Sequence, residues 1–393
     1  HDGDRTLFDL LETVRVYAQD HLRRSGDLEP ARDRHLEHHL ASMTETKQKA
    51  TISYGAATVW DWATVQRWTS TKANLEAAID WAIARGRHHD AGELIAAAGC
   101  VWREDLAVQA TLDRIDAVAA QLPESSDLRE RLWPVEVMLA LAAGARERLL
   151  GAMDGLARSD NDAAREFALA HAANRCAMHD PVQSLRIADQ AASLHSRSSD
   201  LEAAGFWDKN RADNLIFAGD FEQALDTLRP HLGRHLWAVI VGTIAVALLM
   251  NGQPAEALRV ANDHPMSDSI WMSFGVIVGL CHLALGDTEV AQRELVAEAR
   301  WAALGRMNRA PNSALVGLAA LVNHQGDTAW AREIILGARS QREVVFNALA
   351  RAIAEEIGVR DEFIEQQDPV YADYRDDDRR DFLVETLARL DAQ

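Results

Sequence analysis

A short turn of one kind recurs four times between about Ala203 and Arg342 and divides the apolar positions of this stretch into similar blocks. Each turn is a glycine followed by a polar residue, at spacings of 33, 34 and 40 residues: Gly219-Asp220, Gly252-Gln253, Gly286-Asp287 and Gly326-Asp327. Seven positions before each glycine stands a small residue: Ala212, Ala245, Gly279 or Ala319. Five positions after it stands an alanine: Ala224, Ala257, Ala291 or Ala331. Nine positions after it stands an apolar residue: Leu228, Ala261, Leu295 or Ile335. The pattern predicts pairs of helices joined by tight turns.

Elementary backbone chemistry explains the repeated turn. A glycine after a helix can adopt the left-handed conformation that closes the helix. The polar residue behind it can accept hydrogen bonds from the free N–H groups of the next helix, and Asp220 with Gln223 forms a capping-box pattern. Small residues on both sides let the two helices approach closely. The unit of about 34 residues resembles a tetratricopeptide repeat (TPR) and implies a right-handed solenoid, although the usual aromatic residue before the turn is missing.

The start of the chain has a different pattern. Residues 5–11 predict a short strand that leads into a helix, whose apolar face comprises Leu10, Val14, Tyr17, Ala18 and Leu22. Ser25-Gly26 is the expected stop signal of this helix, and a second helix is expected to begin near Pro30.

Two segments resemble a known family, the STAND-class bacterial signalling ATPases of the AfsR- and LuxR-like kind. Residues 10–18 followed by Arg32-Asp33-Arg34-His35 are similar to the end of the winged-helix part of these regulators. Residues 74–82, Asn-Leu-Glu-Ala-Ala-Ile-Asp-Trp-Ala, are similar to the first helix of their repeat region. The resemblance implies an ATP-driven switch that is coupled to a helical-repeat sensor. The chain lacks the phosphate-binding loop of the family and the helix-turn-helix of its LuxR-like members.

We therefore expect an all-α protein, a right-handed solenoid of TPR-like hairpins preceded by a short winged-helix remnant. The predicted divisions are the winged-helix end at 1–44, a linker at 45–73, repeats at 74–358 and capping helices at 359–393. Asp180-Pro181 is expected to open the second helix of a fifth hairpin. The last helix should bury Phe382, Leu383, Leu387 and Leu390, and should cap the solenoid.

Charge and composition narrow the possible partners. The net charge of -19 argues against binding to a nucleic-acid backbone, which requires concentrated Lys and Arg. No window is apolar enough for a transmembrane helix, and Leu236–Met250 is expected to be a buried helix. The three cysteines, Cys100, Cys176 and Cys281, lie far apart, which favours a reducing cytoplasm. Because the chain begins His-Asp-Gly-Asp, we expect it to be part of a longer protein.

Few side-chain groups suggest chemistry. His35 and His39 lie one helical turn apart and could share a metal ion, but no third ligand is identifiable, so a polar helix face is favoured. Cys176 with His171 and His179 lacks an orienting third group for nucleophilic catalysis. The eleven tryptophans are better explained by packing between helices than by a ligand surface. We accordingly assign no catalytic, metal-binding or cofactor-binding residue, and expect no enzymatic activity from this chain.

The resemblance implies a sensor and protein-interaction region that binds a protein, a peptide or a small hydrophobic ligand and controls an ATPase. A scaffold that assembles partner proteins without signalling is the alternative. In TPR-like arrays the first helix of each hairpin lines the concave face, at positions six, three and two residues before each turn glycine. These positions are Asp213, Ile216, Phe217, Val246, Leu249, Met250, Leu280, Leu283, Ala284, Ala320, Asn323 and His324. They either form an open apolar groove or are buried by a tight superhelix, and the sequence leaves both alternatives open.

Overall fold

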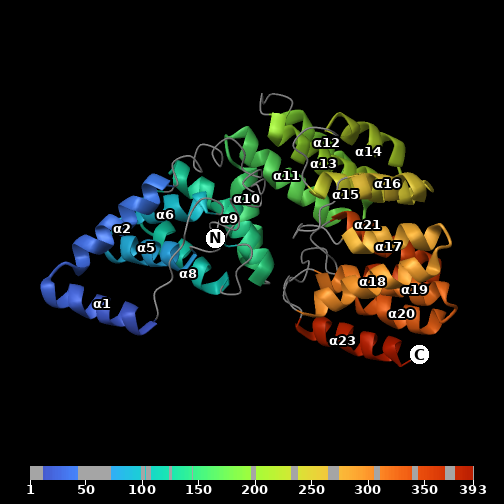
Figure 1. Cartoon of the computed structure of the whole chain (residues 1–393). Helices are drawn as coiled ribbons and strands as arrows, with labels where there is room; N and C mark the ends of the chain where they lie inside the picture. Colours follow the sequence, from blue (N-terminus) through green and yellow to red (C-terminus); the bar gives the residue numbers. More distant parts are fainter. Residues whose placement is uncertain are drawn as a thin grey trace. The chain divides into compact units, whose positions relative to one another are not determined.

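The computed structural model contains helices throughout the part of the chain that it describes (Figure 1). The described residues are 12–42, 72–98, 102, 108–123, 126–143, 145–195, 201–231, 238–263, 274–304, 310–338, 344–367 and 377–392. No strand occurs among them, which confirms the all-α prediction for these residues. The predicted strand at 5–11 and most of the predicted linker at 45–73 lie outside the described residues. The chain divides into two compact units, His1–Leu139 and Ala140–Gln393.

The first unit is built around the packing of α2, α5 and α6. Its helices are α1 (Glu12–Ser25), α2 (Leu28–Ser42), α5 (Lys72–Ala84), α6 (His88–Ala97), α8 (Val108–Ala119) and α9 (Asp127–Ala143), of which α9 ends just beyond the unit. Helix α2 packs against α5 and α6, α8 packs against the same pair, and α1 packs against α2. The fully buried side chains include Leu36, Leu75, Ile79, Leu94 and Ile95.

The second unit is a series of helical hairpins. Its helices are α10 (Arg146–Ala157), α11 (Asp162–Cys176), α12 (Pro181–His195), α13 (Leu201–Ala218), α14 (Phe221–Leu228), the 3-10 helix Arg229–His231, α15 (Ala238–Met250), α16 (Pro254–Asp263), α17 (Phe274–Ala284), α18 (Thr288–Ala303), α19 (Ala310–His324), α20 (Thr328–Gly337), α21 (Val344–Ile357), α22 (Arg360–Glu365) and α23 (Asp377–Asp391). Each helix from α10 to α20 packs against the next one in sequence, and the apolar faces of the helices from α13 onward share one hydrophobic core. As expected, α15 is buried from Ile240 to Leu248.

The repeated turn has the predicted conformation. Seven glycines have a positive φ, among them all four glycines of the sequence pattern. In every case the glycine N–H donates to the carbonyl three residues back, and the next N–H donates to the carbonyl five residues back. This is the hydrogen-bond pattern of the Schellman motif. The other three glycines are Gly26, Gly86 and Gly358, and Gly358 joins α21 to α22 as one more hairpin that the sequence pattern did not include.

The small residues of the pattern lie where two helices touch. Ala224, Ala257, Ala291 and Ala331, which follow the glycines by five positions, are all fully buried. The position seven residues before the glycine faces the position nine residues after it. In the α17–α18 hairpin, a Cβ atom on Gly279 would lie 2.5 Å from Cγ of Leu295. The two helices of this hairpin are therefore as close as a residue without a side chain allows.

Side-chain caps support several of the turns. Asp220 accepts a hydrogen bond from the N–H of Gln223 at 3.2 Å, and the Gln223 amide returns a bond to Asp220 at 3.3 Å. Asp180 accepts from the N–H of Gln183 at 2.9 Å, which confirms the fifth hairpin, α11–α12. Asp327 caps α20 through the N–H of Trp330 at 3.0 Å. Asp287 makes no such bond, and its carboxylate lies 3.3 Å from Nδ1 of His282.

The last helix packs back onto the hairpins that precede it. Helix α23 contacts α18, α19 and α20, and it buries Leu383 and Leu387 while Phe382 and Leu390 are partly buried. These four apolar side chains are those expected from the sequence. The predicted boundary at residue 358 falls in the turn between α21 and α22, so residues 360–365 form the second helix of a hairpin.

Gly279→Ala is expected to destabilise the protein by about 1–3 kcal/mol, because the new methyl group must displace Leu295. Gly151→Ala is the matched control. Gly151 also lies in a helix, but its added Cβ would meet nothing within 4 Å, so this change should be neutral or stabilising by up to about 1 kcal/mol. Urea denaturation followed by circular dichroism measures both. Equal stability of the two variants would show that α17 and α18 are not in close contact at this point.

Candidate functional site in the layer of first helices

The first helices of successive hairpins form a layer, which we call the first-helix layer: α13, α15, α17, α19 and α21. Each of these helices contacts the next first helix, and α21 also contacts α13 and α15, which come much earlier in the chain. In Figure 1, α21 lies behind the space between α15 and α17. The layer therefore curves until its last member meets its first, and an array that is open along this face does not form in this part of the chain.

The closure of the layer places the predicted partner-binding residues in two environments. Asp213, Ile216, Phe217, Val246 and Leu280 are buried. Leu249, Met250 and Leu283, which stand nearest the turns, are partly exposed. Among the further positions, Ala320 and Asn323 are partly exposed, and Ala284 and His324 are exposed. Burial against the protein's own helices thus accounts for all three positions on α13, whereas the positions nearest the turns of α15, α17 and α19 remain at least partly accessible.

Asp213 belongs to a buried ion pair. Its carboxylate lies 2.8 Å from Nζ of Lys209, one helical turn earlier on α13, and both side chains are less than 10% exposed. The hydroxyl of Thr243 on α15 donates to the same carboxylate at 3.3 Å. Sequence reasoning missed Lys209, although an i, i+4 pair of opposite charges on a helix is a readable signal. Removing both charges from water is costly, so this pair has a large effect on stability if either partner is changed.

More polar side chains are buried on the helices around this pair. They are Asn210 on α13, Asn312 and Ser313 on α19, and Asn347 on α21. These helices contact one another through α21. A buried polar side chain is costly unless it is hydrogen-bonded. These side chains therefore restrict how α13, α19 and α21 can pair more than apolar side chains would.

A second polar group ties α11, α12 and α13 together. The hydroxyl of Ser184 on α12 is fully buried and donates to the carbonyl of Ala173 at 2.9 Å. The Asn214 side chain on α13 contacts the Ser184 hydroxyl and donates to Asn174 at 3.2 Å. Ser184 stands at the position that is alanine in the four glycine-turn hairpins. Through its hydroxyl it links α12 to α11 and α13.

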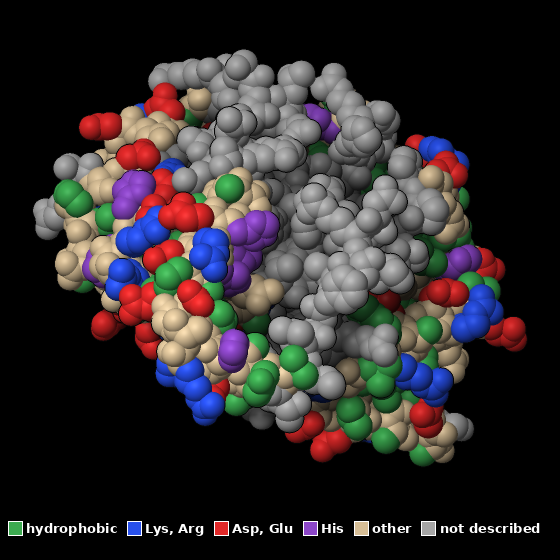
Figure 2. Space-filling view, turned by 60° about the vertical axis from the view of Figure 1, so that its left-hand side comes forward, with side chains coloured by type: hydrophobic (Ala, Val, Ile, Leu, Met, Phe, Trp, Pro, Cys, Tyr) green, Lys and Arg blue, Asp and Glu red, His purple; other side chains and the backbone are tan. Residues whose placement is uncertain are grey.

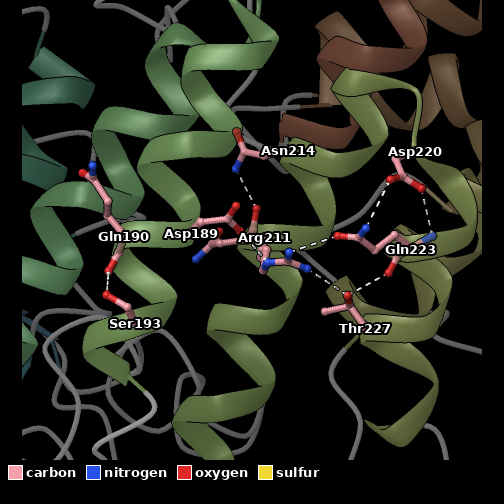
Figure 3. A network of polar contacts seen from close by, with 9 residues as sticks. Asp189, Gln190, Ser193, Arg211, Asn214, Asp220, Gln223 and Thr227 are labelled. Carbon is pink, nitrogen blue, oxygen red and sulfur yellow. Dashed lines mark hydrogen bonds and ion pairs between the residues drawn. The ribbon is translucent and has the colours of Figure 1, made fainter.

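Arg211 extends these contacts to the protein surface (Figure 3). Its guanidinium donates to Asp189 on α12 at 2.9 Å, and to Gln223 and Thr227 on α14 at 3.0 and 3.4 Å. Figure 3 shows the side chain of Arg211 reaching from α13 toward both neighbouring helices. Such exposed contacts contribute little each, and here they orient α12 and α14 on α13.

Cys176 does not have the surroundings of a nucleophile. Burial raises the pKa of the Cys176 thiol, so the reactive thiolate is disfavoured. His171 packs its ring against Phe167, with the ring centroids 4.3 Å apart. Cys281 is more deeply buried, and burial raises the pKa of its thiol to about 12. Both cysteines are free thiols, and Cys100 lies outside the described residues.

The three histidines of α2 lie close together. The Nε2 atoms of His35 and His39 are 3.3 Å apart, and the rings of His38 and His39 have their centroids 5.5 Å apart. Burial lowers the pKa of His39 to about 4, and it also lowers the pKa of His35. Among the described residues, no group of three or more His, Cys, Asp and Glu side chains is placed to hold a metal ion.

The two segments that resemble the STAND-class regulators contact each other in the first unit. The indole N–H of Trp81 on α5 donates to Asp33 on α2 at 2.8 Å, and the Arg32 guanidinium lies over the Trp81 ring at 5.0 Å from its centroid. Two more pairs join the same region, Arg85 with Glu29 at 3.3 Å and Arg87 with Glu37 at 2.8 Å. Arg32, Asp33 and Trp81, which belong to these segments, therefore meet in one interface between α2 and α5.

Exposed apolar side chains lie on α1 and at the turn ends of α15 and α17, among other places. On α1, Val14, Val16 and Tyr17 are 44, 55 and 73% exposed. At the turn ends of α15 and α17, Leu249, Met250 and Leu283 are partly exposed and Leu285 is 41% exposed. We call these last four residues the turn-end strip.

The described residues on the face seen in Figure 2 are mixed in charge. In the view of Figure 2, Lys and Arg side chains are interspersed with Asp and Glu, and histidines lie among them. No helix among the described residues has the length and apolar character that a membrane-spanning helix requires.

Comparisons with known proteins assign no family to the chain. No protein-family model matches it, and no curated protein matches its sequence.

Lys209→Met is expected to destabilise the protein by roughly 3–5 kcal/mol, because it leaves the buried Asp213 carboxylate without its cation. The double variant Lys209→Met with Asp213→Leu should recover most of this loss, since both charges are removed together. Unfolding free energies of the two single variants and the double variant complete the cycle. A double variant that is less stable than either single variant would contradict the ion pair.

Proposed function

We propose that this chain is the sensor and protein-interaction region of a bacterial STAND-class transcriptional regulator of the AfsR- or LuxR-like kind. In this proposal it is a right-handed solenoid of TPR-like hairpins, which binds a protein, a peptide or a small hydrophobic ligand in the cytoplasm. Binding would control an ATPase module that another part of the full-length protein supplies. The chain itself would carry out no catalysis and would need no cofactor.

The observation that carries the proposal is the first-helix layer with its repeated Schellman turns. Hairpins that pack mainly on their sequence neighbours are typical of helical-repeat proteins, whose long surfaces serve in binding. The seven identical turns support a repeat origin for the second unit and for the α5–α6 hairpin of the first. The packing of Trp81 on Arg32 and Asp33 adds support for the regulator family, because the two resembling segments behave as one unit.

The turn-end strip is the part of the predicted partner face that suits binding. Three of its side chains, Leu249, Met250 and Leu283, belong to that face and are partly exposed, and the neighbouring Leu285 is exposed; Asp213, Ile216, Phe217, Val246 and Leu280 of the same face are buried. Neighbouring exposed apolar side chains favour a partner with an apolar face of its own. A protein or an amphipathic peptide fits this strip better than a highly charged ligand.

Met250→Asp with Leu283→Asp is expected to leave the protein folded, with a loss of about 1–3 kcal/mol, because both side chains are partly exposed although they also pack on the edge of the core. The matched interior pair, Ile216→Asp with Val246→Asp, should unfold it, since two unpaired carboxylates would be buried. Thermal unfolding followed by circular dichroism compares the two. Unfolding of the first pair at low temperature would show that the turn-end strip is part of the core.

ATP hydrolysis tests the regulator proposal itself. The 393-residue chain alone should turn over no ATP, whereas the full-length protein should hydrolyse it. Met250→Asp with Leu283→Asp in the full-length protein should change that rate without unfolding the protein. A full-length protein without ATPase activity would overturn the regulator proposal and favour a scaffold that assembles partners.

A further inference from the structure

Helix α2 brings two imidazole nitrogens face to face. His35 and His39 are one helical turn apart, so their side chains leave the helix on the same side. Their Nε2 atoms are 3.3 Å apart, and the two ring planes are inclined by 79°. His39 is only 6% exposed and His35 is partly exposed. The pair is therefore held at the edge of the α2 interface, with one side open to solvent.

The distance between these nitrogens matches the spacing of two ligands on one metal ion. Zinc binds histidine nitrogen at about 2.0–2.1 Å in tetrahedral geometry, so two such ligands lie about 3.3–3.4 Å from each other. Histidines at i and i+4 on a helix are also the spacing used in the helical zinc-binding motif of metalloproteases. The helix backbone alone thus supplies the required geometry, and no rearrangement of α2 is needed.

A hydrogen bond between the two rings is the other explanation of the distance. It requires a proton on one of the Nε2 atoms. Nδ1 of His39 is buried and has no hydrogen-bond partner among the described residues, so no neighbour fixes the ring proton of His39 on either nitrogen. When both rings carry their proton on Nδ1, neither Nε2 atom can donate to the other, and a cation on which both lone pairs converge would satisfy both.

We infer that α2 carries a two-histidine site for a divalent transition-metal ion of the zinc class, with Nε2 of His35 and Nε2 of His39 as its ligands. No third His, Cys, Asp or Glu of the described chain joins them, so the remaining coordination positions are open to water or to a donor from another molecule. Such a site binds more weakly than a closed four-ligand structural site. It is independent of the regulator proposal, since it rests on α2 alone.

Titration calorimetry with zinc chloride tests the site on the untagged 393-residue chain. The wild-type chain should bind one equivalent that His35→Gln weakens by about tenfold or more, because one of the two ligands is lost. His38→Gln is the matched control. It removes a neighbouring, exposed histidine and leaves the same total number of histidines, so it should bind as the wild type does.

Cobalt(II) absorption supplies a second readout that reports ligand geometry. Bands of nitrogen-bound cobalt should appear with the wild type and His38→Gln, and should be lost with His35→Gln. Zinc binding of equal strength in wild type and His35→Gln would overturn the inference and assign the pair to a hydrogen bond. Absence of binding by the wild-type chain would overturn it as well. Unchanged circular dichroism of His35→Gln would exclude unfolding as the cause of a loss.

Discussion

Close contact between paired helices, allowed by the missing or minimal side chains at their crossing, is the constraint on which the second unit depends. The first helices α13, α15, α17, α19 and α21 are each followed by a glycine with positive φ, and two backbone hydrogen bonds reverse the chain there. The reversal brings the position seven residues before the glycine against the position nine residues after it. Gly279 and Leu295 show how little room is left. Repetition of this geometry stacks one hairpin on the next and builds a continuous core.

The curvature of that stack decides which residues are accessible. Because α21 meets α13 and α15, the faces of the first helices turn toward one another and enclose Asp213 with Lys209. A buried ion pair contributes little net stability compared with apolar residues of the same size, but it penalises any arrangement in which the two charges separate. Both charges lie on α13 and stay together however this helix packs, so the tie to the neighbouring helix comes from the hydrogen bond that Thr243 on α15 donates to Asp213. What remains for partners is the strip of apolar side chains next to the turns.

The first unit adds an interface with a different chemistry. Aromatic, cationic and carboxylate groups alternate between α2 and α5, with Trp81 at the centre of the contact. The histidine pair lies on α2 as well, two and six residues after Asp33. A helix that carries both a polar interface and a pair of imidazoles, next to an α1 whose apolar side chains are exposed, has the features of a region that meets other molecules.

Local interactions determined what the sequence could predict. The glycine turns, the caps at Asp180 and Asp220 and the buried alanines depend on residues within about one hairpin of each other, so their pattern is readable along the chain. Gly358 was missed because Val359 follows it instead of a capping residue, although its turn has the same hydrogen bonds. Only the tertiary structure decided that Asp213, Ile216 and Val246 are interior, because their burial comes from hairpins far along the chain. The pairing of Trp81 with Asp33 was likewise invisible, since it joins segments separated by residues 43–71. The contact of α21 with α13 and α15 depends on the sum of the small rotations between successive hairpins, and no single residue determines that sum.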